Sequence, residues 1–219
     1  MADLPIERLG YKQPPFTNTG VDYFGPFLVP IRRSTEKRWG FLFTCLTTRA
    51  VHIEVVPSLD TSSCVMGVEM FIARRGTPTT IMSDNGTNFK GIKWKFNPPS
   101  APHHGGSWER LVRSVKRVLY DILGNRRVTE EVLRTTLCLV EQFLNARPIT
   151  AVSSDPLDLE ALTPNHFILG QHAASFPSLS FEENFDHKKW FVRAQSYANA
   201  MDTVDAGIRS FPQKEGKVA

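Results

Sequence analysis

The stretch SDNGTNF, residues 83–89, decides the fold of this chain. It follows a short apolar run at residues 80–82, and its Asn-Gly pair is a turn dipeptide. Asp84 is therefore predicted to end a β-strand where the chain turns sharply. Open α/β sheets place ligand chemistry at strand ends of this kind. Asp84 is the first candidate site residue.

Two further stretches each place one carboxylate beside a strand or helix signal. Asp22 lies in TGVDYFGPF, within an apolar strand pattern over residues 19–31. Burying an acid in the middle of such a strand is costly unless a partner compensates it, so a structural, hydrogen-bonded Asp is the alternative interpretation. Glu109 lies in GGSWERLV, in the first turn of the most strongly periodic helical pattern. Three such carboxylates could converge on divalent metal.

The helix that carries Glu109 is predicted to have two distinct sides. At about 100° per residue its apolar residues fall on one side. Glu109 shares the other side with four cations, which are candidates for binding phosphates. The alternative is a solvated helix face on which Glu109 pairs with Arg113 at i,i+4. The four cations are Arg110, Arg113, Lys116 and Arg117.

Length and composition set broad bounds. The 219 residues, 41% of them hydrophobic, are enough for one large domain with a real core. The net charge of +4 is only a weak bias toward polyanions. Cys45, Cys64 and Cys138 are widely spaced, so we expect reduced, buried thiols and neither a disulfide framework nor a zinc site. No apolar run approaches membrane-spanning length, so we expect no membrane partner. We expect an intracellular location.

The chain is predicted to have an extended lead-in at 1–18, a core at 19–150, and a loop-rich and helical C-terminal extension at 151–219 that is truncated. Within the core, a basic turn at residues 32–38 is predicted to join the first two of three antiparallel strands. A helix and a strand parallel to the first one follow. The predicted strands are 19–31, 39–46, 50–56, 79–83 and 92–96, and the helices are one through 65–72, one from about 108 to 123 and one after the N-cap residue Thr129.

The three acids and their surroundings resemble the catalytic core of retroviral-type integrases, in the version found in BEL/Pao retrotransposons. The likeness extends over roughly residues 5–170. It includes the motifs FNPPSAPHHGG, EQFLNARPIT and ALTPNHFILG besides the three acid-bearing stretches. Several motifs in the same order are far more specific than any single acid.

The resemblance implies an α/β fold of the ribonuclease H-like class, a mixed five-stranded sheet flanked by helices. It implies that Asp22, Asp84 and Glu109 are catalytic and bind two Mg²⁺ or Mn²⁺ ions for DNA 3′-end processing and strand transfer. The implied partners are the DNA ends of the element and a target duplex, and a homo-oligomer is compatible with it. No small-molecule cofactor is expected, and the implied location is the nucleus.

The chain departs from the family's pattern between the second and third acids. Their separation is 109 − 84 = 25 positions, shorter than in the family by about three helical turns or more. One helix is therefore expected to be missing. Three functions stay open: an active polynucleotidyl transferase, a catalytically inactive nucleic-acid-binding module derived from one, and a ribonuclease H-like nuclease.

Overall fold

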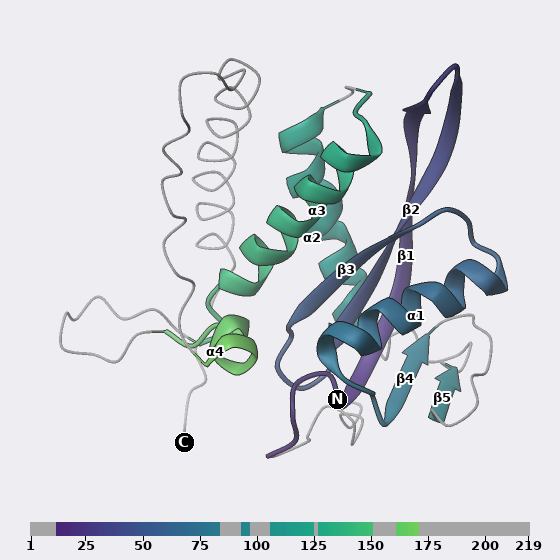
Figure 1. Cartoon of the computed structure of the whole chain (residues 1–219). Coiled ribbons are helices and arrows are strands. Elements are labelled where there is room, and N and C mark those ends of the chain that lie inside the picture. The colour runs from purple at the N-terminus through teal and green to yellow at the C-terminus, as the bar shows by residue number, and fades with distance from the viewer. Residues whose placement is uncertain (1–11, 84–92, 97–105, 125–126, 151–160, 171–219) are drawn as a thin grey trace.

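The computed structural model describes residues 12–83, 93–96, 106–124, 127–150 and 161–170. Five strands form one mixed sheet in the order β3-β2-β1-β4-β5, and helices cover both of its faces (Figure 1). The predicted fold class, an α/β fold with a mixed five-stranded sheet flanked by helices, is confirmed. The elements are β1 Asn18–Ile31, β2 Ser34–Cys45, β3 Val51–Val56, α1 Thr61–Arg75, β4 Thr80–Ser83, β5 Lys93–Phe96, α2 Gly106–Leu123, α3 Glu130–Ala146 and α4 Pro164–Leu169.

Strand pairing follows the predicted order. The first three strands form an antiparallel meander, and β4 pairs with β1 in parallel, with Gly20 opposite Met82. β5 continues the sheet beside β4, also in parallel. The predicted absence of a helix between the second and third acids concerns residues 84–92 and 97–105, which lie outside the described residues.

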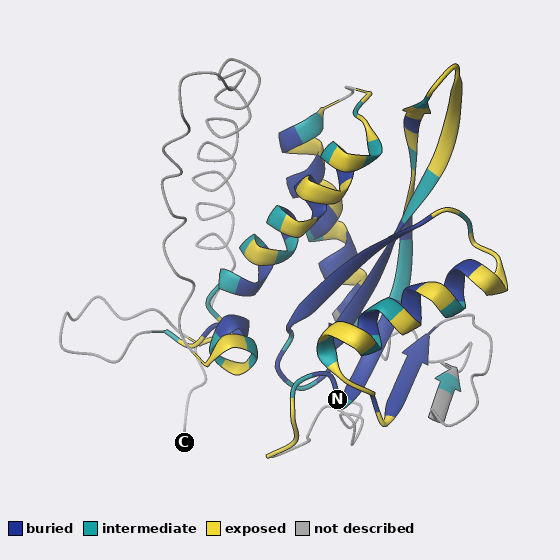
Figure 2. Ribbon diagram, in the orientation of Figure 1, coloured by how far each residue is buried: buried dark blue, intermediate teal, exposed yellow. Residues whose placement is uncertain are grey.

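Alternating side chains divide the protein into two cores. On β1, Val21 belongs to the core under α1, and Phe24 belongs to the core under α2 and α3. Successive strand residues point to opposite faces, so Gly20 and Asp22 face α2 and α3 together with Phe24. The sheet is buried on both sides, as Figure 2 shows by the dark blue of its central strands.

The hairpin between β1 and β2 is longer than predicted. The predicted basic turn at 32–38 is wrong, because β2 begins at Ser34 and the chain turns only at Arg32 and Arg33. Arg38 forms ion pairs with Glu36 and with Glu130 of α3. Charged residues can occupy this part of the strand because the hairpin projects beyond the body of the sheet and is exposed (Figure 2).

The thiols are only partly as predicted. Cys45 and Cys64 are buried, but Cys138 lies on the exposed side of α3. None of the helices in the described ranges is long and apolar enough to cross a membrane.

Side chains of α3 satisfy the open edge of β3. Asn145 accepts a hydrogen bond from the Val51 N–H at 2.8 Å and donates one to the Val51 carbonyl at 2.9 Å. Four residues earlier, Glu141 accepts from the Ile53 N–H at 2.8 Å. Unpaired edge groups invite pairing with other chains, so these side chains take the place that a sixth strand would occupy. Both residues belong to the EQFLNARPIT motif.

Glu141 also anchors a buried histidine. His52 is 3% exposed and lies between Glu141 and Glu54, with Nε2 2.9 Å from Glu54 and Nδ1 3.1 Å from Glu141. Arg74 and Arg75, at the end of α1, pair with the two carboxylates. Both ring nitrogens of His52 therefore have carboxylate partners.

We predict that this cluster makes stability depend on pH. Burial alone would lower the pKa of His52, but the hydrogen bonds to Glu141 and Glu54 outweigh it and raise the pKa above its usual value. The stabilisation from protonated His52 is therefore complete below the unfolded pKa of about 6.5 and is lost as the pH rises through the folded pKa. Urea unfolding of the protein and of His52→Gln, compared across pH, should show a difference in unfolding free energy that shrinks on the alkaline side.

Glu141→Gln should reduce that pH-dependent difference and destabilise the fold by about 3 kcal/mol, because it removes one of the two carboxylates that contact the buried imidazolium and leaves only Glu54. Glu131→Gln is the matched control, since Glu131 is exposed on the same helix. A His52→Gln difference that stays constant with pH would contradict this role.

Candidate functional site

Asp22 lies in the middle of β1, opposite Leu42 of β2, on the face that α2 and α3 cover. It is half-buried, and its Oδ1 accepts a hydrogen bond from the Tyr23 N–H at 2.7 Å. The carboxylate is thus fixed by its neighbour's backbone without being sealed in the core. This placement fits a ligand-binding acid at least as well as the structural interpretation.

A tight contact fixes the first turn of α2 on this strand. A Cβ atom added to Gly20 would lie 2.4 Å from Cε3 of Trp108, far inside contact distance. Trp108 is 1% exposed and packs with Leu46 and Met82. Only glycine at position 20 therefore lets the indole ring lie against the strand, two residues before Asp22.

Glu109 follows Trp108 and is exposed. Among the ion pairs of the described residues none joins Glu109 to Arg113, but the side of the helix that carries both is exposed, as the alternative of a solvated face expects. The adjacent Arg110 donates from Nε to the Gly106 carbonyl at 2.8 Å. Asp22 and Glu109 thus flank one contact: Asp22 lies two residues beyond Gly20, and Glu109 lies next to Trp108.

Asp84 lies outside the described residues. Its neighbour Ser83 is the last residue of β4 and is 3% exposed. Within the described ranges no group of three or more His, Cys, Asp or Glu side chains could hold a metal ion. The three-acid site therefore stays a prediction. Two of its members, Asp22 and Glu109, lie beside the contact between Gly20 and Trp108.

The two sides of α2 are as the sequence predicts. Its apolar side is buried: Trp108, Leu111, Val112, Val115, Val118, Leu119 and Ile122 are each at most 8% exposed. Arg110, Arg113, Lys116 and Arg117 are exposed on the other side. Their exposure leaves them able to contact an external anion, while their role in binding DNA stays a prediction.

Sequence reasoning missed Gly20 and Trp108. The only available signal was a glycine two residues before the strand acid, on the same face, and a large aromatic residue next to the helical acid. Nothing in either stretch alone links the two, because they are 88 positions apart (108 − 20).

Comparison with known proteins supports the fold. No protein-family model matches the chain, and no curated protein matches it. Among solved structures, the catalytic core domain of bovine immunodeficiency virus integrase aligns with a TM-score of 0.50 and 19% identity, over 71% of this chain and 95% of that one. A chain of the simian T-cell lymphotropic virus intasome, solved with the PP2A regulatory subunit B56 gamma, aligns with a TM-score of 0.51 and 15% identity. That alignment covers 79% of this chain and 59% of the viral one, so the chain spans about three fifths of that neighbour's length.

We predict that Gly20→Ala destabilises the fold by about 1–3 kcal/mol, because the new methyl group must displace Trp108 or the strand. Chemical denaturation measures the loss. Gly106→Ala is the matched control, since nothing lies within 4 Å of a Cβ added there, at the start of the same helix. Gly20→Ala combined with Trp108→Leu should recover part of the lost stability. A Gly20→Ala protein as stable as the parent would refute the contact.

Proposed function

We propose that this chain is the catalytic core of a retrotransposon-derived integrase of the BEL/Pao type, which processes DNA 3′ ends and transfers them to a target duplex. The observation that carries the proposal is the placement of Asp22 and Glu109 on either side of the Gly20–Trp108 contact, within an integrase-like fold. A nuclear location is part of the same proposal.

The third acid of the proposed site is Asp84. β1 and β4 run in parallel with Gly20 opposite Met82, so the same register extended by two positions would pair residue 84 with Asp22. The peptide bond after Ser83 keeps the next Cα within about 3.8 Å of the buried end of β4. These two facts support Asp84 as the neighbour of Asp22 in the proposed site.

The donor set suits hard divalent cations. The half-buried carboxylate of Asp22, the exposed one of Glu109 and that of Asp84 are the oxygen ligands that Mg²⁺ and Mn²⁺ prefer. A pair of such ions supplies the activation of a nucleophile and the stabilisation of the leaving oxygen in phosphoryl transfer. The residues contribute more than ligation: the Tyr23 N–H holds the Asp22 carboxylate in place, and the buried Trp108 fixes the turn that carries Glu109.

The exposed side of α2 is proposed to bind the DNA backbone. Its four cations begin one residue after Glu109 and extend for two turns away from it. Contacts to phosphates of this kind are independent of sequence and weaken with salt. One of the structural neighbours is part of an intasome. By analogy, we propose DNA and further copies of the chain as partners.

A second candidate function is a catalytically inactive nucleic-acid-binding module of the same descent. The shortened interval between Asp84 and Glu109 favours it, because fewer residues are available to bring the helical acid to the strand acids. This module would retain the cations of α2 without metal-dependent chemistry.

We predict that Glu109→Gln and Asp22→Asn each reduce Mg²⁺-dependent strand transfer at least about a hundredfold, since each removes a charged metal ligand. Strand transfer of a labelled duplex end into plasmid DNA is the assay, and Glu131→Gln is the control of unchanged activity. Strand transfer that survives Glu109→Gln would refute the proposal. DNA binding without any metal-dependent nicking would support the inactive module, and cleavage of the RNA strand of a hybrid would support a nuclease.

The DNA-binding face has a separate test. Arg113→Gln with Arg117→Gln should flatten the slope of log affinity against log salt by about 0.9 for each phosphate that the variant no longer neutralises, because fewer counterions are released. Arg134→Gln is the control, since that arginine is paired with Glu130 on α3. Fluorescence anisotropy with a labelled duplex at several salt concentrations gives both slopes. An unchanged slope would remove this face from the DNA site.

A further inference from the structure

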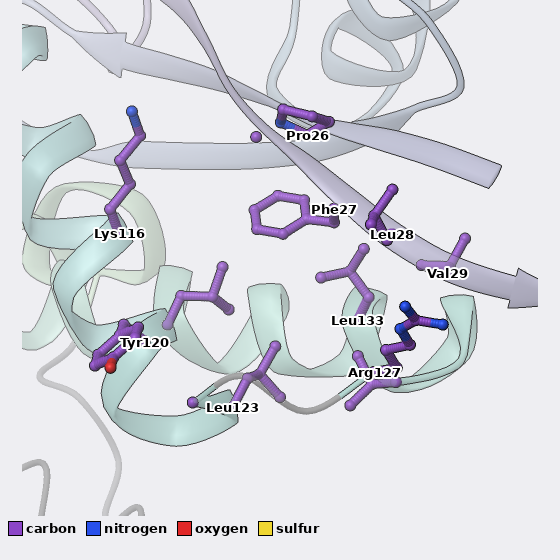
Figure 3. Close-up of a pocket in the computed structure, with 13 residues that line it drawn as sticks. Pro26, Phe27, Leu28, Val29, Lys116, Tyr120, Leu123, Arg127 and Leu133 are labelled. Atoms are coloured by element: carbon purple, nitrogen blue, oxygen red, sulfur yellow. The ribbon is translucent and has the colours of Figure 1, made fainter. Parts of the chain in front are cut away.

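A groove with a volume of about 620 Å³ lies between β1, the C-terminal half of α2 and the start of α3 (Figure 3). It begins near Gly25, where the pairing of β1 with β2 shifts register, and ends at the turn that leads to Leu133. Pockets of a few hundred Å³ or more with apolar walls are the usual form of binding sites for small groups and side chains. The groove is at the opposite end of α2 from Glu109.

The floor of the groove is apolar and its rim is basic. Phe27 and Leu123 pack against the core at the bottom, and Leu28 and Tyr120 are 47% and 64% exposed beside it. Figure 3 shows Lys116 and Arg127 on either side of the Phe27 ring.

Within the described parts of the chain neither Lys116 nor Arg127 forms an ion pair. The apolar floor offers nothing to a phosphate backbone, whereas a peptide with large apolar side chains next to carboxylates would satisfy both floor and rim.

The chain itself contains a segment of this chemistry. Residues 181–186 are FEENFD, two phenylalanines with three carboxylates among them. We propose that the groove binds this segment of the same chain, with phenylalanine side chains on the apolar floor and carboxylates beside Lys116 and Arg127. The proposal does not depend on the function proposed for the carboxylate site.

The chain is long enough for this contact. The last described residue is Gly170, and 181 − 170 = 11 residues can span up to about 36 Å when extended. α4 packs against α3, and Leu133, near the other end of α3, lines the groove. The 17 residues of α3 cover only about 26 Å, so residue 181 can reach the groove from α4.

Reversal of charge on either side of the contact tests it in the full chain. Lys116→Glu with Arg127→Glu, and separately Glu182→Lys with Glu183→Lys, should each speed amide hydrogen exchange over residues 119–128 by about tenfold, as the covered end of α2 opens. All four substitutions together should restore slow exchange. Arg110→Glu with Arg113→Glu, an equal charge change near the other end of α2, should leave these amides unchanged.

Disulfide formation tests which chain supplies the segment. In a Cys138→Ser background, Tyr120→Cys with Phe185→Cys should form a disulfide within one chain in a glutathione buffer, visible by intact mass. Arg110→Cys with Phe185→Cys should not, since residue 110 lies about 15 Å along the helix.

Three results would overturn the proposal. A disulfide-linked dimer would assign the groove to the segment of a second copy. No disulfide, or no restoration by the fourfold charge swap, would show that the segment does not bind there. If amide exchange over residues 119–128 is slow only with added duplex DNA, and is unaffected by Glu182→Lys with Glu183→Lys, the groove is a nucleic-acid site.

Discussion

The contact between Trp108 and Gly20 is the constraint on which the candidate site depends. It is the point where α2, which carries Glu109, lies directly on β1, which carries Asp22. Three buried side-chain polar atoms in the described structure have no hydrogen-bond partner, and two of them belong to this contact or lie beside it: Nε1 of Trp108, and Oγ1 of Thr44, the residue opposite Gly20. An unsatisfied buried polar group costs about 1–3 kcal/mol, so the apolar contacts of the Trp108 ring have to offset such a cost at this position.

A second constraint is the set of hydrogen bonds that joins α3 to the open edge of the sheet. Asn145 and Glu141 bond the open edge of β3, and Arg147, which directly follows α3, donates to the Arg49 carbonyl at 2.6 Å. These contacts hold the C-terminal half of α3 against the sheet. Because α2 packs against both α3 and β1, the edge bonds of β3 also limit how far α2 can move. The motif around these residues is therefore explained by folding without any role in chemistry.

Much of the fold could be predicted from local pattern, and the rest could not. The apolar pattern of β1 predicts the strand, and the 3.6-residue period of α2 predicts its buried side, since each depends only on near neighbours in sequence. The long hairpin was missed because its charged residues, such as Arg38, are held by Glu130, 92 positions away. The contact of Trp108 with Gly20 also joins residues that are far apart in the sequence. Of the candidate site, the sequence indicated the acids, but the means by which Asp22 and Glu109 are brought to one contact exists only in the folded chain.

The two ends of α2 serve different surfaces. Glu109 lies in its first turn and Leu123 is its last residue, so 14 residues, or about 21 Å, separate the acid from the apolar groove. A rigid helix transmits position over that length, whereas a charge of one sign is strongly screened beyond about 8–10 Å at ordinary salt. Whatever occupies the groove can therefore shift the carboxylate end only by moving the helix. Since Trp108 packs tightly against Gly20, such movement must disturb that contact. Lys116 lines the groove and is also one of the four cations proposed to bind DNA, so the two surfaces share this residue.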